Sequence, residues 1–293
     1  MDAHDALAQA QALYDEMLEI DPREPDIWHL LGTIFFNHHH FERAIELMDK
    51  TLHLNPHHPN AHYIKANALN ELRCFEAALE HYTCAIQMNP AFSEAYFNKA
   101  LVLKQLERYE EAVETYTQAI ACDEHFALAY SNRGNVYKAL NAYENALEDY
   151  EKAIELDPEF GDAYTNRAII LFELRHYTKA LESCNKAIAL APNSPHAYCT
   201  KADTLKILNH HEEALELYNK ALELSPLFVE AHCNKGNALK ALRRYDEALE
   251  SYTKALEINP NYPNAYRNVS LLFLVMGRLK EGFELYEWRW QKD

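Results

Sequence analysis

Residues 93–126 read SEAYFNKALVLKQLERYEEAVETYTQAIACDEHF, and this stretch decides the fold. Tyr96 and Ala100 lie four residues apart, as neighbours on one face of a helix do. Ala112 and Tyr116 repeat this spacing later in the stretch. The alanines allow two helices to approach closely, while the tyrosines fill the space beside them. The stretch therefore predicts two short helices packed against each other.

The same pattern recurs every 34 residues along the chain. One alanine keeps its phase throughout: Ala10, Ala44, Ala78, Ala112, Ala146, Ala180, Ala214 and Ala248. A proline that stops the second helix keeps another phase: Pro22, Pro56, Pro90, Pro158, Pro192, Pro226 and Pro260. No insertion interrupts the frame, so the sequence predicts an array of helix pairs.

These positions resemble the tetratricopeptide repeat family. Its pattern of aromatic, small, small, aromatic and proline residues matches Trp28, Gly32, Ala44, Met48 and Pro56. The resemblance implies an all-α fold, a right-handed superhelix of antiparallel helix pairs. It also implies a concave groove lined by the first helix of each pair.

One solenoid is expected over residues 1–293, in three parts. Residues 1–24 supply a leading half-repeat, residues 25–262 form seven 34-residue repeats, and residues 263–293 form a degenerate C-terminal repeat or cap. The last part carries Trp288 and Trp290, which either cover the last hydrophobic face or begin a junction. It is similar to the junction in bacterial proteins whose tetratricopeptide repeats precede a glycosyltransferase-type domain.

Composition excludes several classes of function. The chain has 45 acidic and 28 basic residues, and its net charge of -17 opposes binding to nucleic acid. It has no run of about 18 apolar residues, and its start lacks the features of a secretory signal. We therefore expect a cytoplasmic protein with no membrane and no nucleic-acid partner. Its 6 cysteines lack zinc-ligand spacing and are expected to be reduced thiols.

Helical phase places one column of asparagines on the predicted groove. This asparagine column contains Asn98, Asn132, Asn166, Asn234 and Asn268. A carboxamide offers one acceptor and one donor, so such a column can hold the backbone of an extended peptide. A similar ladder lines the repeats of O-GlcNAc transferases, which implies peptide binding here. The alternative is that these asparagines pair with neighbouring helices.

Three more sets complete the predicted peptide-binding site. One turn beyond the asparagine column lie Asn67, Asn135 and Asn237, with Asp203 in the same phase. The lysine column, Lys104, Lys138, Lys206 and Lys240, adds positive charge that would suit acidic peptides, unless these lysines pair with adjacent carboxylates. Tyr63 and Phe97 are candidate aromatic anchors.

A different basic column is expected to support the fold rather than to bind a ligand. It contains Lys65, Lys99, Arg133, Arg167, Lys201 and Lys235. By phase these residues lie on the packing side, where their stems cover apolar surface and their charged ends reach acidic neighbours.

Catalytic chemistry has no visible apparatus in this sequence. Phosphate-loop, dinucleotide, metalloprotease and serine-hydrolase signatures are absent, so no catalytic residue and no cofactor are predicted. The run 38–40 of histidines is a weak metal candidate, and no metal site is predicted. The preferred function is a non-catalytic scaffold that binds an extended peptide or partner segment. The alternatives are the substrate-recognition arm of a longer glycosyltransferase and a module that self-associates through its terminal helices.

Overall fold

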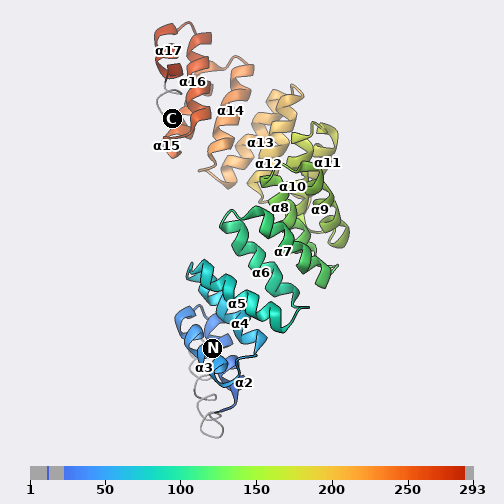
Figure 1. Ribbon diagram of the computed structural model, residues 1–293. Helices are drawn as coiled ribbons and strands as arrows, with labels where there is room; N and C mark the ends of the chain where they lie inside the picture. Colours follow the sequence, from blue (N-terminus) through green and yellow to red (C-terminus); the bar gives the residue numbers. More distant parts are fainter. Residues whose placement is uncertain (1–11, 13–22, 288–293) are drawn as a thin grey trace. The chain divides into compact units, whose positions relative to one another are not determined.

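The computed structural model describes residue 12 and residues 23–287, and in this part of the chain it consists of helices joined by short turns (Figure 1). Sixteen helices are present in these residues, without strands. In chain order they are α2 (Pro25–Asn37), α3 (Phe41–Leu54), α4 (Pro59–Glu71), α5 (Phe75–Met88), α6 (Ser93–Gln105), α7 (Tyr109–Cys122), α8 (Ala127–Ala139), α9 (Tyr143–Leu156), α10 (Gly161–Glu173), α11 (Tyr177–Leu190), α12 (Pro195–Ile207), α13 (His211–Leu224), α14 (Val229–Ala241), α15 (Tyr245–Ile258), α16 (Pro263–Val275) and α17 (Leu279–Glu287).

The all-α fold and its helix pairs are confirmed. Even-numbered helices are the first helices of the pairs, and odd-numbered helices are the second helices. The predicted leading helix falls almost entirely on residues 1–22, and Trp288 and Trp290 follow residue 287, so both lie outside the described residues.

A left-handed residue closes the turn inside each pair. After α4, Arg73 has a φ of 60°, and the Cys74 N–H donates to the Leu69 carbonyl at 2.8 Å. This bond and the left-handed residue together satisfy the free carbonyls at the helix end, as a Schellman cap does. The same backbone conformation recurs at the equivalent positions: His39, Arg73, Glu107, Asn141, Arg175, Asn209, Arg243 and Gly277.

Contacts between Cα atoms divide the chain into two compact units, Met1–Asp149 and Tyr150–Asp293. In the N-terminal unit, α2 packs on α3, α4 on α5 and α6 on α7, and each second helix contacts the next first helix. The C-terminal unit repeats this arrangement from α10 to α17.

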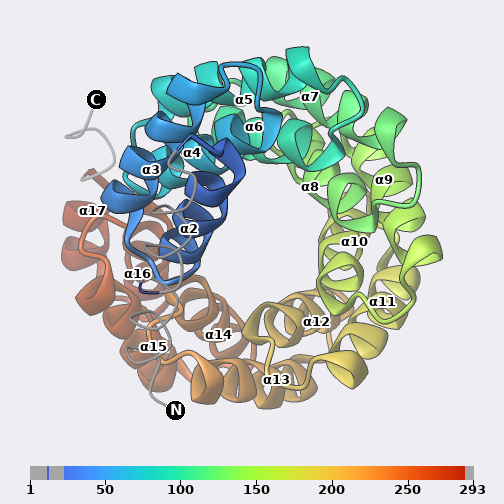
Figure 2. The ribbon, with the colours of Figure 1, turned by 90° about the horizontal axis from the view of Figure 1, so that it is seen from below.

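Within each unit the first helices form one layer. In the N-terminal unit α2, α4, α6 and α8 contact one another in order, and in the C-terminal unit α10, α12, α14 and α16 do so. Among the described residues of either unit, no two second helices touch. Figure 2 accordingly shows the even-numbered helices of each unit on the inner side and the odd-numbered helices on the outer side. We call the first helices of a unit its inner layer.

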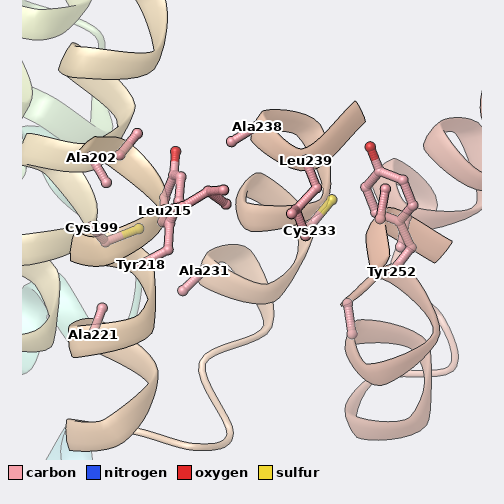
Figure 3. Packing of buried hydrophobic residues seen from close by; sticks show 14 of the residues in the cluster. Cys199, Ala202, Leu215, Tyr218, Ala221, Ala231, Cys233, Ala238, Leu239 and Tyr252 are labelled. Carbon is pink, nitrogen blue, oxygen red and sulfur yellow. The ribbon is translucent and has the colours of Figure 1, made fainter. Parts of the chain in front are cut away.

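Alanine and tyrosine fill the core of each unit. The recurring alanines of the second helices, such as Ala112 and Ala214, are fully buried. Figure 3 shows the C-terminal unit, where Tyr218 and Tyr252 stand in consecutive repeats with their hydroxyls toward the same side. Leu239 lies between the two rings. The close helix approach inferred from the small residues is therefore confirmed.

Three members of the basic column join neighbouring helices, as expected from their phase. Lys65 Nζ lies 2.5 Å from Asp49 Oδ1. The Arg133 guanidinium donates to both oxygens of the buried Asp149 carboxylate, at 2.9 and 2.7 Å. Arg167 Nε donates to Ser183 Oγ at 3.1 Å. These cations are used in packing and are not available to a ligand.

Candidate functional site

Asn98 joins two first helices of the N-terminal unit. Its Nδ2 atom donates to the Tyr63 hydroxyl at 2.9 Å and to Asn67 Oδ1 at 3.0 Å. Both acceptors lie on α4, one repeat earlier. The amino group of Asn98 therefore pairs with a neighbouring helix, as the alternative to peptide binding held. Its Oδ1 atom accepts no hydrogen bond from the described residues, and this acceptor remains for a ligand.

In three of the helix pairs, a tyrosine of the second helix bonds to a polar side chain of the first helix. The Tyr82 hydroxyl donates to Asn67 Oδ1 at 2.6 Å, so Asn67 Oδ1 receives hydrogen bonds from both Tyr82 and Asn98. In the C-terminal unit the Tyr252 hydroxyl donates to Asn237 Oδ1 at 2.8 Å, and Asn237 Nδ2 lies 3.5 Å from Asn234 Oδ1. Asn67 thus links α4 to both α5 and α6, whereas Asn237 links α14 to α15 within one pair.

Asp203 holds the corresponding place one repeat before Asn237. It accepts from the Tyr218 hydroxyl at 2.6 Å, from Lys206 Nζ at 2.6 Å and from Asn234 Nδ2 at 3.3 Å. The Cys199 thiol lies 3.9 Å from Asp203 Oδ2 and is a fourth donor. Sequence phase places Asp203 one turn beyond the asparagine column, in line with Asn67, Asn135 and Asn237. The role of Asp203 as a shared acceptor was not predicted from the sequence, although its charge could have suggested it.

The other asparagines of the column differ in their surroundings. Asn132 Nδ2 donates to the Leu128 carbonyl at 3.0 Å, and Asn132 Oδ1 accepts from Lys104 Nζ at 3.3 Å. Asn166 is half-buried and makes no side-chain hydrogen bond to another described residue. Asn268 is only 6% exposed, and its Nδ2 atom lies 3.2 Å from Cys233 Sγ. The structure therefore places Asn268 inside the C-terminal unit.

The lysine column divides into paired and unpaired members. Lys206 pairs with Asp203. Lys104, Lys138 and Lys240 are half-buried and form no ion pair with any carboxylate of the described residues. Burial lowers the pKa of each of these three, and the charge of Lys104 lowers the pKa of Lys138 further. These lysines carry charge that the protein itself does not neutralise.

The two predicted aromatic anchors are packed to different degrees. Phe97 is 7% exposed, and its ring lies 4.9 Å from that of Phe126 and 5.7 Å from that of Tyr116. It belongs to the core of the N-terminal unit. Tyr63 is half-buried against Phe92, and burial raises the pKa of its hydroxyl. Leu128, which the sequence did not single out, is 45% exposed on α8 and offers apolar surface instead.

Models of tetratricopeptide repeats match this chain over a long continuous region. Those described as "Tetratricopeptide repeat" match residues 127–160, 161–194 and 229–262, and residues 81–114 and 183–216. One described as "TPR repeat" matches residues 100–141 and 202–243. Together they cover residues 81–262. The chain belongs to the tetratricopeptide repeat family. A model of "Anaphase-promoting complex, cyclosome, subunit 3" also matches residues 3–85.

Several solved tetratricopeptide structures are similar to this chain. The crystal structure of YrrB, described as a TPR protein with an unusual peptide-binding site, is 29% identical. The match covers 64% of this chain and 96% of YrrB, with a TM-score of 0.52.

Two further structures support the fold alone. The structure of the APC/C hetero-tetramer Cut9-Hcn1 is 16% identical with a TM-score of 0.68, covering 92% of this chain and 52% of that one. A tetratricopeptide repeat protein from Parabacteroides merdae is 18% identical with a TM-score of 0.67, covering 78% of this chain and 91% of that one. Among curated proteins none matches this chain.

The tetratricopeptide fold is typical of protein–protein interaction, and proteins of this family are generally non-catalytic scaffolds. None of the described helices combines the length and the apolar character needed to cross a bilayer. The models and structures named above include no glycosyltransferase, so the likeness to O-GlcNAc transferases remains a prediction.

Proposed function

We propose that this protein is a non-catalytic scaffold that holds an extended segment of a partner protein against the inner layer of its first helices. We further propose that it acts in the cytoplasm, with protein or peptide partners rather than nucleic acid or membrane. The peptide-binding site named in the structure of YrrB is consistent with such a role for a related fold.

One observation carries the proposal: the inner layer holds half-buried polar groups without an internal partner. They include Asn166, Lys138 and Lys240. On the second helices, by contrast, exposed charges pair locally, as in Lys220 with Glu223 and Lys254 with Glu257. Half-buried groups without partners are poorly hydrated in the free protein. A hydrogen bond from a ligand to such a group therefore contributes more binding free energy than a hydrogen bond to an exposed group on the outer surface.

A backbone-binding role suits the asparagines that keep a free atom. Asn98 uses its amino group within the protein and leaves its carbonyl oxygen as an acceptor for a peptide N–H. Asn166 can offer both a donor and an acceptor. Such contacts hold an extended main chain with little dependence on side chains.

The last repeat supports a second candidate function. On α17, Leu279 and Phe283 are each 57% exposed, whereas the equivalent surface of earlier second helices packs against the helix pair that follows. A following domain, as in a glycosyltransferase with a repeat arm, or a second copy of this chain would cover this face. Concentration-dependent light scattering of a Phe283→Ser variant beside the wild type would identify self-assembly.

The inner layer can be tested by affinity capture from lysate of the source organism, with quantitative mass spectrometry of the bound proteins. The inner variant combines Asn166→Ala, Lys138→Gln and Lys240→Gln, whose side chains lack hydrogen bonds and ion pairs with other described residues. The control combines Asn219→Ala, Lys220→Gln and Lys254→Gln on exposed positions of second helices.

Both variants change the net charge equally, and both must melt like the wild type. We expect partners that the wild type and the control retain to be depleted from the inner variant. Equal capture by all three proteins would show that partners bind elsewhere.

A further inference from the structure

In the C-terminal unit, a carboxylate of the protein itself neutralises one member of the lysine column, Lys206. Asp203 lies three residues before Lys206 on α12 and accepts a hydrogen bond from its ammonium at 2.6 Å. The same carboxylate also receives the hydroxyl of Tyr218 and the amide of Asn234. These donors together form a binding place for one carboxylate, and in this unit Asp203 itself occupies it.

In the N-terminal unit the equivalent carboxylate is missing. Lys104 has Leu101 three residues before it on α6, and Lys138 has Asn135 at that position on α8. Lys104 reaches across to α8, where its Nζ atom donates to Asn132 Oδ1 at 3.3 Å. Neither lysine has an acidic partner among the residues that the structure describes.

The two ammonium groups are close enough to affect each other. Burial lowers the pKa of both lysines, and the charge of Lys104 is the second cause of the lowered pKa of Lys138. An anion between them would relieve this repulsion and replace lost hydration. The position is therefore electrostatically ready for one negative group.

Apolar surface lies next to these lysines. Leu128 precedes Asn132 by one helical turn and is 45% exposed, and its carbonyl accepts the Asn132 amide. Leu101 precedes Lys104 on α6 and is half-buried. A ligand that reaches the lysines along the inner layer would place a neighbouring group against these leucines.

We infer that the N-terminal unit recognises a partner segment in which an aspartate or glutamate, flanked by an apolar residue, places its carboxylate between Lys104 and Lys138. The apolar neighbour covers Leu101 and Leu128. This inference rests on the proposed function, because it names the side chains for which the inner layer is selective. It assigns to the ligand the place that Asp203 occupies in the C-terminal unit.

The test uses a library of random 12-residue peptides displayed on phage at the amino terminus of the coat protein. No displayed peptide then has a free carboxyl terminus, so every enriched carboxylate belongs to an aspartate or glutamate. A second library with free carboxyl termini separates side-chain from terminal carboxylates. Both are selected on the full chain and on a Lys104→Gln, Lys138→Gln double variant.

Three further proteins complete the set. Lys206→Gln removes a lysine that Asp203 already neutralises, and Lys220→Gln removes one on the exposed side of α13. A charge-reversed variant, Lys104→Glu with Lys138→Glu, tests rescue. Circular dichroism of each variant confirms that the fold is retained.

We expect the wild type to enrich aspartate or glutamate beside an apolar residue, and the double glutamine variant to lose this preference. Lys220→Gln should keep it, and the charge-reversed protein should select lysine or arginine at the same place. In fluorescence polarisation, replacing the selected acid by its amide should weaken binding to the wild type about tenfold or more.

Other outcomes separate the two proposals. Enriched peptides without an acidic preference would overturn this inference and leave the peptide scaffold intact. Acidic enrichment found only with free carboxyl termini would overturn the side-chain assignment. Failure to enrich any peptide on the wild type would count against the proposed function itself.

Discussion

Tyr116 lies on the second helix α7 and differs from the equivalent tyrosines in its hydrogen bonding. Tyr82, Tyr218 and Tyr252 each donate a hydrogen bond to an asparagine or aspartate on the first helix of their own pair. In the pair that contains Tyr116, the first helix carries Leu101 at the position of this asparagine or aspartate. The buried Tyr116 hydroxyl has no hydrogen-bond partner in the described part of the chain. A buried hydroxyl without a partner carries a desolvation cost.

We expect Tyr116→Phe to leave the free energy of unfolding unchanged or to raise it slightly, because it removes an unsatisfied group. Tyr82→Phe, its matched control, should lower stability by about 1 kcal/mol, since it removes a formed hydrogen bond. Urea unfolding followed by circular dichroism measures both. Equal losses in the two variants would show that the Tyr116 hydroxyl has a partner after all.

The positions of these residues were predictable from sequence, but their partners were not. Helical phase placed Asn67 and Asn98 together on the first helices, and the structure joins them through a hydrogen bond of 3.0 Å. Whether a carboxamide bonds to a neighbour or to a ligand depends on distances between helices that periodicity does not supply. One signal was present in the sequence: repeats with an asparagine or aspartate at this position of the first helix also carry a tyrosine on the second helix, and these two side chains bond in three repeats.

At the scale of the helix pair, α4 and α5 are joined by histidines. His62 Nδ1 lies 2.8 Å from His81 Nδ1, so one nitrogen must donate and the other accept. Burial lowers the pKa of both rings, and burial together with the charges of Lys65 and His62 lowers that of His81 to about 4. The pair is therefore built around neutral imidazoles.

We expect this pair of helices to lose stability as the pH falls from about 6.5 toward about 4. In this range the unfolded histidines bind protons more readily than the folded ones, so acid favours unfolding. Hydrogen exchange resolved to α4 and α5 measures the effect. His81→Gln should flatten the pH dependence, and the exposed His125→Gln should not; an unchanged profile in both would contradict this account.

The turn inside each pair was only partly visible in the sequence. The polar residues between the two helices of a pair predicted where the turn lies. Glycine is the usual sign of a left-handed residue, but seven of the eight residues with this conformation are not glycine. Gly277 alone carries it. The hydrogen bonds of the helix end, rather than the residue type, hold the conformation.

Replacing one of these corner residues by glycine should therefore stabilise its turn. We expect Arg243→Gly to raise the free energy of unfolding by about 0.5 kcal/mol, because the strain of a side chain at positive φ exceeds the added freedom of the unfolded chain. Thermal and urea unfolding measure this. Ala241→Gly, two residues earlier within α14, is the control and should lower stability by roughly 0.5–1 kcal/mol. A loss in both variants would mean that the Arg243 side chain contributes more than its strain costs.

At the scale of the whole molecule, stability is expected to be a sum of repeats and their junctions. Ala112 is fully buried where α7 packs in the core of the N-terminal unit. Ala112→Leu adds volume that the close helix contact cannot accept, at a cost of roughly 1–3 kcal/mol. We expect faster hydrogen exchange in α6 and α7, with α12–α15 as protected as in the wild type. A uniform change along the chain would show that the array unfolds as one body.

The inner layer also has a mechanical consequence. In each unit the first helices touch one another in order, whereas the second helices touch only first helices. Bending that spreads the second helices apart would leave the row of first helices closed, and we expect a unit to flex about that row. A segment lying along this row would keep its contacts in register while the outer face stretches and recoils. A partner segment bound along the inner layer, as proposed, would then stay bound while the second helices move apart.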